Sequence, residues 1–146
     1  MTNRTVLAPI DVAKAYFDRD DRGAPELFEL FAEDFTFYFP KFGLGKGVRE
    51  FVACMSGLLD RVESIKHDLG RTSFIAAGDK VIVEGISSGW MKTGKEWRGG
   101  ATPGGRFCNV FEIRDSLIQR VHIYLDPDYV SEDVERFLWK GRESRW

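Results

Sequence analysis

The sequence predicts an α+β domain, because helical periodicity dominates its first half and strand periodicity most of its second half. The chain has 146 residues, a usual length for one domain, so we expect a single domain over 1–146. Apolar residues recur every three or four positions within 48–62, as on one side of a helix. From residue 64 onward they alternate, as in strands with one buried face. The predicted order is three helices, a run of antiparallel strands and a short terminal helix.

The three helices are expected within the first 62 residues. Asp11 can cap a first helix over 12–19. Pro25 suits the first turn of a second helix over 25–31. A short strand at 35–39 then precedes the third helix. That helix has the clearest apolar stripe, which consists of Val48, Phe51, Val52, Met55, Leu58, Leu59 and Val62.

The strands follow the third helix. They are expected at 64–76, at 80–90 and in a long hairpin over 106–126. A glycine-rich connection over 91–105, with a bent strand around Trp97, precedes the hairpin. Asp115 and Ser116 form the hairpin's polar turn. Ser131 can cap the final short helix.

The hairpin contains one polar residue within an apolar row. The row in its first arm is Phe107, Asn109, Phe111 and Ile113. The second arm has Val121, Ile123 and Leu125 on one face and Arg120, His122, Tyr124 and Asp126 on the other. A buried amide must find hydrogen-bond partners or cost free energy. Asn109 is therefore either a structural bridge or part of a site.

Composition and charge exclude several classes of function. A net charge of −2 and scattered Lys and Arg argue against nucleic acid as a partner. No apolar run is long enough to span a membrane. Cys54 and Cys108 have no metal-ligand spacing and suggest a reduced compartment. We expect a cytoplasmic protein. Twelve Phe residues predict an apolar core or cavity that takes a small hydrophobic molecule.

Several segments in this order resemble a known family. They are 12–17 (Val-Ala-Lys-Ala-Tyr-Phe), 29–35 (Glu-Leu-Phe-Ala-Glu-Asp-Phe), 47–51 (Gly-Val-Arg-Glu-Phe), 78–81 (Gly-Asp-Lys-Val) and 123–127 (Ile-Tyr-Leu-Asp-Pro). The chain resembles the SnoaL-like branch of the nuclear transport factor 2-like superfamily over about residues 10–130. The resemblance implies a cone-shaped α+β fold, in which a strongly curved mixed or antiparallel sheet wraps over the three N-terminal helices. Relatives differ in reaction, so the resemblance alone does not give the function.

The resemblance also implies roles for individual residues. In ketosteroid isomerases a base carboxylate ends the first strand, where this chain has Phe39. Their oxyanion-binding tyrosine matches Tyr16, and their hairpin acid matches Asn109, whose amide could still polarise a carbonyl. The Asp–Arg–Asp set of limonene epoxide hydrolases falls on Ser87, Gly85 and Ile123, so that chemistry is not expected.

Scytalone dehydratases and polyketide cyclases offer two further comparisons. The first use a strand histidine, an asparagine and tyrosines, which here are His67, Asn109, Tyr16 and Tyr38. Their second histidine has no counterpart, since Ser88 and Trp90 stand nearby. Asp126 resembles the acid that polyketide cyclases place at the end of the last strand.

These comparisons favour a cofactor-independent isomerase, dehydratase or cyclase that transfers protons on an apolar carbonyl or hydroxy compound. The candidate catalytic residues are His67, Tyr16, Asn109 and Asp126, and the candidate substrate-binding residues are Phe39, Tyr38, Trp90, Phe111, Ile123 and Leu125. We expect no metal and no organic cofactor. We also expect a homodimer that covers apolar area around Trp90, Val110 and Tyr124.

Each catalytic candidate also has a structural interpretation. His67 could be a satisfied core histidine, and Tyr16 a packing residue with a tethered hydroxyl. Asp126 could cap the turn at Pro127. The alternative function is therefore a non-catalytic ligand-binding, accessory or interaction domain of the same fold.

Overall fold

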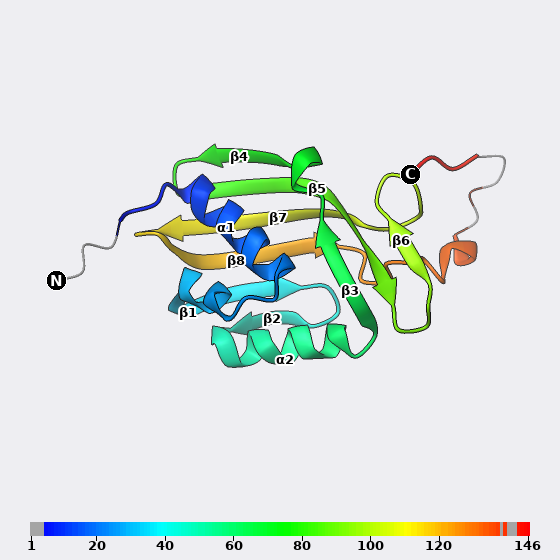
Figure 1. Ribbon diagram of the computed structural model, residues 1–146, viewed down its shortest axis with the longest axis horizontal. Helices are drawn as coiled ribbons and strands as arrows, with labels where there is room; N and C mark the ends of the chain where they lie inside the picture. Colours follow the sequence, from blue (N-terminus) through cyan, green and yellow to red (C-terminus); the bar gives the residue numbers. More distant parts are fainter. Residues whose placement is uncertain (1–4, 138, 140–142) are drawn as a thin grey trace.

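The computed structural model describes residues 5–137, 139 and 143–146, in which helices lie on one face of a curved, eight-stranded mixed sheet (Figure 1). The helical elements are α1 (Pro9–Asp21), η1 (Pro25–Leu30), α2 (Gly47–Leu59), η2 (Leu69–Arg71) and η3 (Val134–Arg136). The strands are β1 (Phe31–Phe39), β2 (Gly43–Lys46), β3 (Val62–His67), β4 (Ser73–Ala77), β5 (Lys80–Met91), β6 (Glu96–Arg98), β7 (Arg106–Arg114) and β8 (Leu117–Leu125). The sheet order is β2-β1-β8-β7-β5-β3, and β4 and β6 also pair with β5. The predicted α+β fold class is confirmed.

The first helix is longer than predicted. It begins at Pro9, whose missing N–H costs nothing at a helix start, and it continues to Asp21 instead of ending near Arg19. Asp20 and Asp21 are thus part of its last turn. The second predicted helix is a single 3₁₀ segment, η1, which passes directly into β1.

The predicted apolar stripe of the third helix is only partly buried. In α2, Phe51 and Cys54 are buried, whereas Val48, Val52 and Leu59 are exposed. The helix packs on β1 and β2 at one edge of the sheet, so it buries a narrower face than the sequence suggested (Figure 1). The helix ends at Leu59, and Val62 begins β3.

The hairpin is confirmed in both its register and its faces. Arg114 pairs with Leu117, so the loop has two residues, Asp115 and Ser116. Both have positive φ, 53° and 61°, as a type I′ hairpin turn requires. The row with Asn109 is buried, Val121 and Ile123 are buried, and Leu125 is half-buried. Arg120, His122 and Tyr124 lie on the opposite face.

The sheet is mixed, one of the two forms that the resemblance implied, because β1 runs parallel to β8. Two predicted segments differ from the structure. The strand expected over 64–76 is two strands, β3 and β4, which η2 separates and which pair with different parts of β5. The expected terminal helix is reduced, within the described residues, to the turn η3. Residues 138 and 140–142 of that region lie outside the described part of the chain.

The interior contains two clusters of buried side chains. The larger one lies between α1, η1, α2 and the sheet, and aromatic rings dominate it: Phe17, Phe31, Phe35, Phe37, Phe51 and Phe111. The smaller one contains Trp97 and Tyr129, whose rings stack with centroids 4.4 Å apart. Leu58 and Leu125 pack against both clusters. None of the helices in the described residues has the length and apolar character needed to cross a membrane.

Candidate active site

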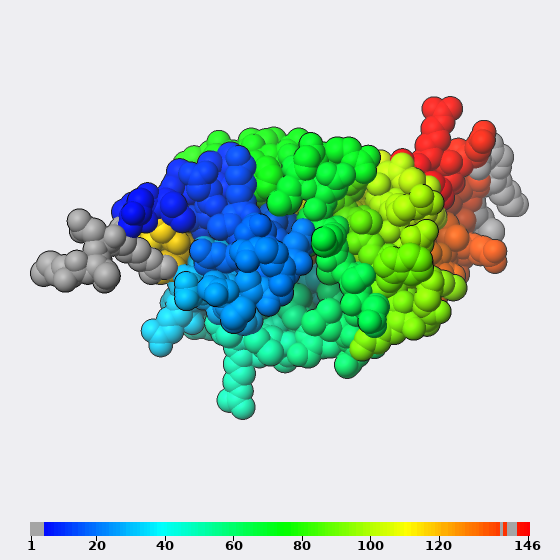
Figure 2. All heavy atoms as spheres, viewed as in Figure 1, coloured from blue at the N-terminus to red at the C-terminus, as the bar shows by residue number. Residues whose placement is uncertain are grey.

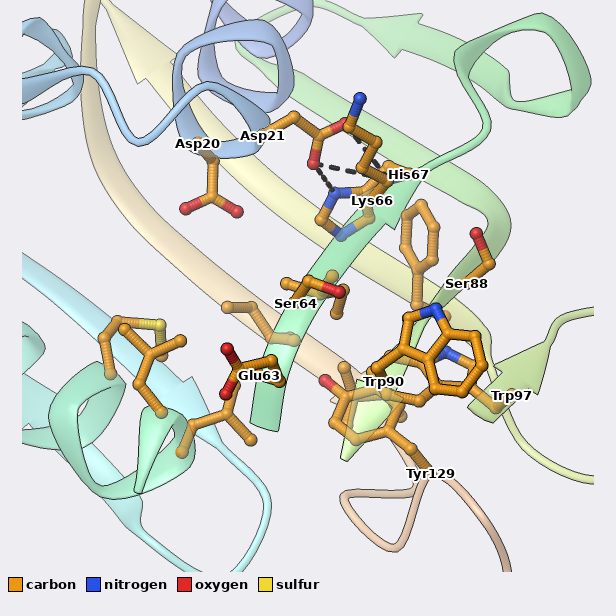
Figure 3. Close-up of a pocket in the computed structure, with 18 of the residues that line it drawn as sticks. Asp20, Asp21, Glu63, Ser64, Lys66, His67, Ser88, Trp90, Trp97 and Tyr129 are labelled. Carbon is orange, nitrogen blue, oxygen red and sulfur yellow. Dashed lines mark hydrogen bonds and ion pairs between the residues drawn. The ribbon is translucent and has the colours of Figure 1, made fainter. Parts of the chain in front are cut away.

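A cavity of about 760 Å³ extends between the two clusters, a volume suited to a small organic molecule. Its walls come from α1, α2, β1, β3, β5, β6, β7, β8 and Tyr129. In the space-filling view, the blue atoms of α1 and η1 and the green atoms of β3 lie in front of the sheet and hide most of β7 and β8 (Figure 2). The last turn of α1 and the strand β3 form the polar side of the cavity (Figure 3).

A hydrogen-bonded pair, Asp21 and His67, joins α1 to β3. Asp21 Oδ1 lies 2.6 Å from His67 Nδ1, and Asp21 Oδ2 accepts the backbone N–H of His67 at 3.0 Å. Only 11% of the His67 side chain and 14% of the Asp21 side chain are exposed. A carboxylate only accepts, so neutral His67 carries its proton on Nδ1, and Nε2 is left with a free lone pair. Figure 3 shows that second ring nitrogen on the side away from Asp21.

Two aromatic rings fix the plane of the His67 imidazole. Phe17 and Phe107 each place a ring centroid 4.9 Å from that of His67, both edge to face. The imidazole is therefore held by Asp21 on one edge and by rings on its sides. A positioned imidazole with a free ring nitrogen in a cavity wall can take a proton from a bound molecule.

Asp20 brings a second carboxyl group to the same end of the cavity. This carboxyl has no hydrogen bond to another described residue, and Figure 3 shows it pointing from the end of α1 into the cavity. Burial raises the pKa of Asp20; the positive charge of protonated His67 works against this shift and the negative charge of Asp21 adds to it.

Asp20, Asp21 and His67 could also hold a metal ion. Each offers a ligand atom within 4.8 Å of the others. An acid–base cluster needs the same spacing, so we assign no metal to these three residues on geometry alone.

Tyr16 and Asn109 add hydrogen-bonding groups to the interior of the cavity. Both are only 3% exposed. Burial, followed by the nearby charge of Asp20, raises the pKa of Tyr16 well above its ordinary value, so its hydroxyl remains a donor. Asn109 Oδ1 is buried and has no hydrogen-bond partner among the described residues. Such an atom is rare in folded proteins and calls for a donor from a ligand or water.

Seven of the ten residues proposed from the sequence line the cavity. They are Tyr16, Phe39, His67, Trp90, Asn109, Ile123 and Leu125. Trp90 is 47% exposed and stands at the rim, not on the opposite sheet face where a dimer contact was expected.

The structure places the other three outside the cavity. Asp126 is exposed, and its Oδ1 accepts the N–H of Asp128 at 2.9 Å, as in a turn cap. Tyr38 alternates with Phe37 and Phe39 and so lies on the other face of the sheet, with its ring 5.6 Å from that of Tyr124. Phe111 is completely buried beneath Tyr16, with ring centroids 5.1 Å apart.

Sequence reasoning missed Asp20, Asp21 and Tyr129. A signal for Asp20 exists, since it follows Tyr16 by four residues and so lies on the same side of a helix. Asp21 gave no such signal, because its partner His67 is 46 residues away. Ser87, matched earlier to a catalytic position, is structural: its Oγ accepts the Trp97 indole N–H at 3.2 Å and donates to the Gly105 carbonyl at 3.3 Å.

Comparisons with known proteins agree with this fold. The family model described as a SnoaL-like domain matches residues 13–121. No curated protein sequence matches the chain. An NTF2-like protein of unknown function from Burkholderia pseudomallei superposes with a TM-score of 0.71 at 13% identity, over 86% of this chain and 99% of its own.

Two other similar structures have more informative descriptions. A candidate polyketide cyclase from Pseudomonas putida has a TM-score of 0.66 at 20% identity, over 85% of this chain and 96% of its own. TerC, co-crystallised with polyporic acid, has a TM-score of 0.67 at 15% identity, over 82% and 92%. At these identities the likeness shows a shared fold.

Proposed function

The chain belongs to the SnoaL-like domain family, and from its cavity we propose that it is a cofactor-independent enzyme that transfers protons on a small, largely apolar carbonyl or hydroxy compound. The observation that carries this proposal is the 2.6 Å contact between Asp21 and His67 in the cavity wall. A histidine that only filled the core would not need a buried carboxylate partner and a free ring nitrogen at a cavity.

In the proposed reaction His67 is the base. Asp21 holds the proton on Nδ1, orients the ring and stabilises the imidazolium that forms when Nε2 accepts a proton. Tyr16 and the Asn109 amide hold the substrate oxygen, where negative charge develops. The unpartnered Asn109 Oδ1 is suited to a hydroxyl of the same substrate.

The cavity lining supports an apolar substrate. Phe39, Leu58, Ile65, Ile123 and Leu125 line it and offer apolar contacts to a bound molecule. The comparisons lend further support: one similar structure is a candidate polyketide cyclase, and TerC takes up polyporic acid in its crystal. Both descriptions concern small organic molecules.

The test is proton exchange on a simple ketone, 4-phenylbutan-2-one, in D₂O. A base in the cavity should replace the hydrogens next to the carbonyl by deuterium, which proton NMR measures directly. His67→Gln should slow this exchange by roughly 10²–10⁴-fold, the usual effect of losing a positioned base. Asp21→Asn should also slow it, because an amide can donate to Nδ1 and so favour the tautomer with Nε2 protonated.

The matched control is His122→Gln, which changes the second of the two histidines, outside the cavity. It should exchange at the wild-type rate. Exchange no faster than in buffer, or equal exchange by the His67 and His122 variants, would contradict the proposal. Binding of the ketone without exchange would favour the alternative function, a non-catalytic ligand-binding domain.

A further inference from the structure

We infer that Asp20 is a second catalytic group, the acid that gives a proton to a leaving hydroxyl while His67 removes a proton from carbon. This inference rests on the proposed function and goes one step beyond it. It assigns two separate proton-transfer groups to one end of the cavity, and it defines the substrate class as β-hydroxy carbonyl compounds.

The first argument is the geometry of the two neighbouring carboxyl groups. Asp21 is engaged twice by His67, through Nδ1 and through the backbone N–H. The Asp20 carboxyl has no hydrogen bond to any other described residue and points into the cavity (Figure 3). A half-buried carboxyl without a protein partner is stabilised by its own proton or by a hydrogen bond from a bound molecule or water. Asp21 therefore orients the base, and Asp20 is available to the substrate.

The second argument is the charge of the cluster. Asp20, Asp21 and His67 have side-chain atoms within 4.8 Å of one another. When His67 is neutral and ready to act as a base, no positive charge in this cluster favours an Asp20 anion, while Asp21 repels one. Asp20 therefore holds a proton more readily than an ordinary aspartate, in agreement with the upward direction of its pKa. The neutral form of His67 thus favours the acid form of Asp20 beside it.

The step that follows is an elimination of water. His67 Nε2 takes a proton from the carbon next to the substrate carbonyl, and the electron pair of that C–H bond becomes the new C=C bond. The C–O bond of the β-hydroxyl breaks with its electron pair, and the leaving oxygen takes the Asp20 proton and departs as water. His67 ends protonated and Asp20 ionised, so the charge of the cluster is unchanged. A proton passed from His67 to Asp20 through water restores the first state.

Tyr16 lies one helical turn before Asp20 on α1, and both line the cavity. Its protonated hydroxyl can hold the carbonyl oxygen, so the carbonyl and the leaving hydroxyl would lie along the same helix face. A β-hydroxy ketone places these two oxygens on carbons two bonds apart, which suits donors one turn apart.

The experiment compares two reactions of the same protein. The first is elimination of water from 4-hydroxy-4-phenylbutan-2-one, followed by the ultraviolet absorption of the conjugated product 4-phenylbut-3-en-2-one. The second is the deuterium exchange of 4-phenylbutan-2-one, which needs only the base. Asp20→Asn keeps the size of the side chain but has no proton to give. It should slow elimination by roughly 10²–10⁴-fold and exchange by less than about tenfold.

The pH profile gives a readout that a structural role would not change. Wild-type elimination should fall as the pH rises through the pKa of Asp20, and Asp20→Asn should lose this dependence. The matched control is Asp18→Asn. Asp18 lies on the exposed side of the same helix, and its carboxylate pairs with Arg22 at 2.8 Å. This substitution should leave both reactions unchanged.

Several outcomes would overturn the inference. Elimination by Asp20→Asn within threefold of wild type, or an equal loss of both reactions, would show that Asp20 is not a specific acid. Elimination lost in EDTA and restored by Zn²⁺ would make Asp20 a metal ligand instead. Exchange without elimination by the wild-type protein would overturn the acid role and leave the proposed function intact, whereas absence of exchange would contradict the proposed function itself.

Discussion

Asp20 carries a half-buried carboxyl group that has no hydrogen-bond partner among the described residues, and the same property that suits it to acid catalysis costs stability. In the unfolded chain it ionises near its ordinary pKa of 3.8, whereas in the folded protein burial raises its pKa. Between these two values the folded state holds more protons than the unfolded state. The stability therefore falls as the pH rises from about 3.8 through the folded pKa, and remains lower above it.

Asp20→Asn should thus raise the free energy of unfolding at neutral pH, by about 1.4 kcal/mol for each unit by which the fold raises the pKa. Near pH 3 the gain should shrink, because wild-type Asp20 is then protonated in both states. Urea unfolding at the two pH values measures the difference. A variant that is less stable than wild type at neutral pH would contradict this account, as would an equal gain at both pH values.

The sequence predicted some site residues because their elements have a clear period. Asn109 and Ile123 follow from alternation in the hairpin, and His67 from alternation in β3. Asp126 and Tyr38 lie outside the cavity for the same reason: alternation places them with the polar face, and only the resemblance to relatives favoured them. Asp21 could not be predicted, since its role depends on how far α1 extends and on a partner distant in sequence.

At the scale of elements, the wall of the cavity depends on one glycine near the end of β5, Gly89. Gly89 pairs with Ile65 of β3 on one side and Trp97 of β6 on the other. A Cβ at position 89 would overlap the Ser64 carbonyl oxygen and the indole ring of Trp97. Because Gly89 has no side chain, β3, β5 and β6 can pack closely at this point. Trp97, which is fully buried, thereby becomes part of the cavity wall.

Gly89→Ala should therefore destabilise the protein by about 1–3 kcal/mol, the usual cost of overpacking, because a backbone oxygen and a buried indole must move. Gly57→Ala is the control: Gly57 lies in α2 with nothing within 4 Å of a new Cβ. That change should be neutral or stabilising, since alanine favours helices by about 1 kcal/mol over glycine. Thermal unfolding measures the melting temperatures of the two variants. Equal melting temperatures would contradict the claim that a Cβ at position 89 overpacks the cavity wall.

Other element boundaries depended on contacts that periodicity does not record. Alternation at Ile65, His67 and Leu69 suggested one strand over 64–76, but Asp68 turns the chain by accepting the N–H and guanidinium of Arg71, so two strands result. In α2, apolar residues occur on a wider stripe than the sheet edge can cover, which leaves Val52 exposed. Contacts with other parts of the fold, not local sequence preference, therefore set the break between β3 and β4 and the exposure of Val52.

At the scale of the molecule, the helices cover only one face of the sheet (Figure 1). The other face carries Tyr38, Ile82, Val110, Arg120, His122 and Tyr124, which we call the open face. Tyr124 is 49% and Ile82 39% exposed. Arg120 Nε is buried without a hydrogen-bond partner in the described part of the chain, although Glu112 lies 3.8 Å away. Burial and the charge of Arg120 lower the pKa of His122, so its ring is uncharged at neutral pH.

These features predict a homodimer in which two open faces meet. A patch with exposed aromatic side chains, a neutral histidine and an unsatisfied donor resembles a protein interface more than a free surface. A stable contact would bury on the order of 1,200 Å² or more in total.

Light scattering at micromolar concentration should therefore give twice the mass of one chain. Tyr124→Asp should shift the mass toward that of a monomer, because it places a charge at the centre of the contact. Val52→Asp adds the same charge on the helical side and should leave the dimer intact. A wild-type protein that scatters as a monomer, or two variants with the same mass, would show that the open face is left to solvent.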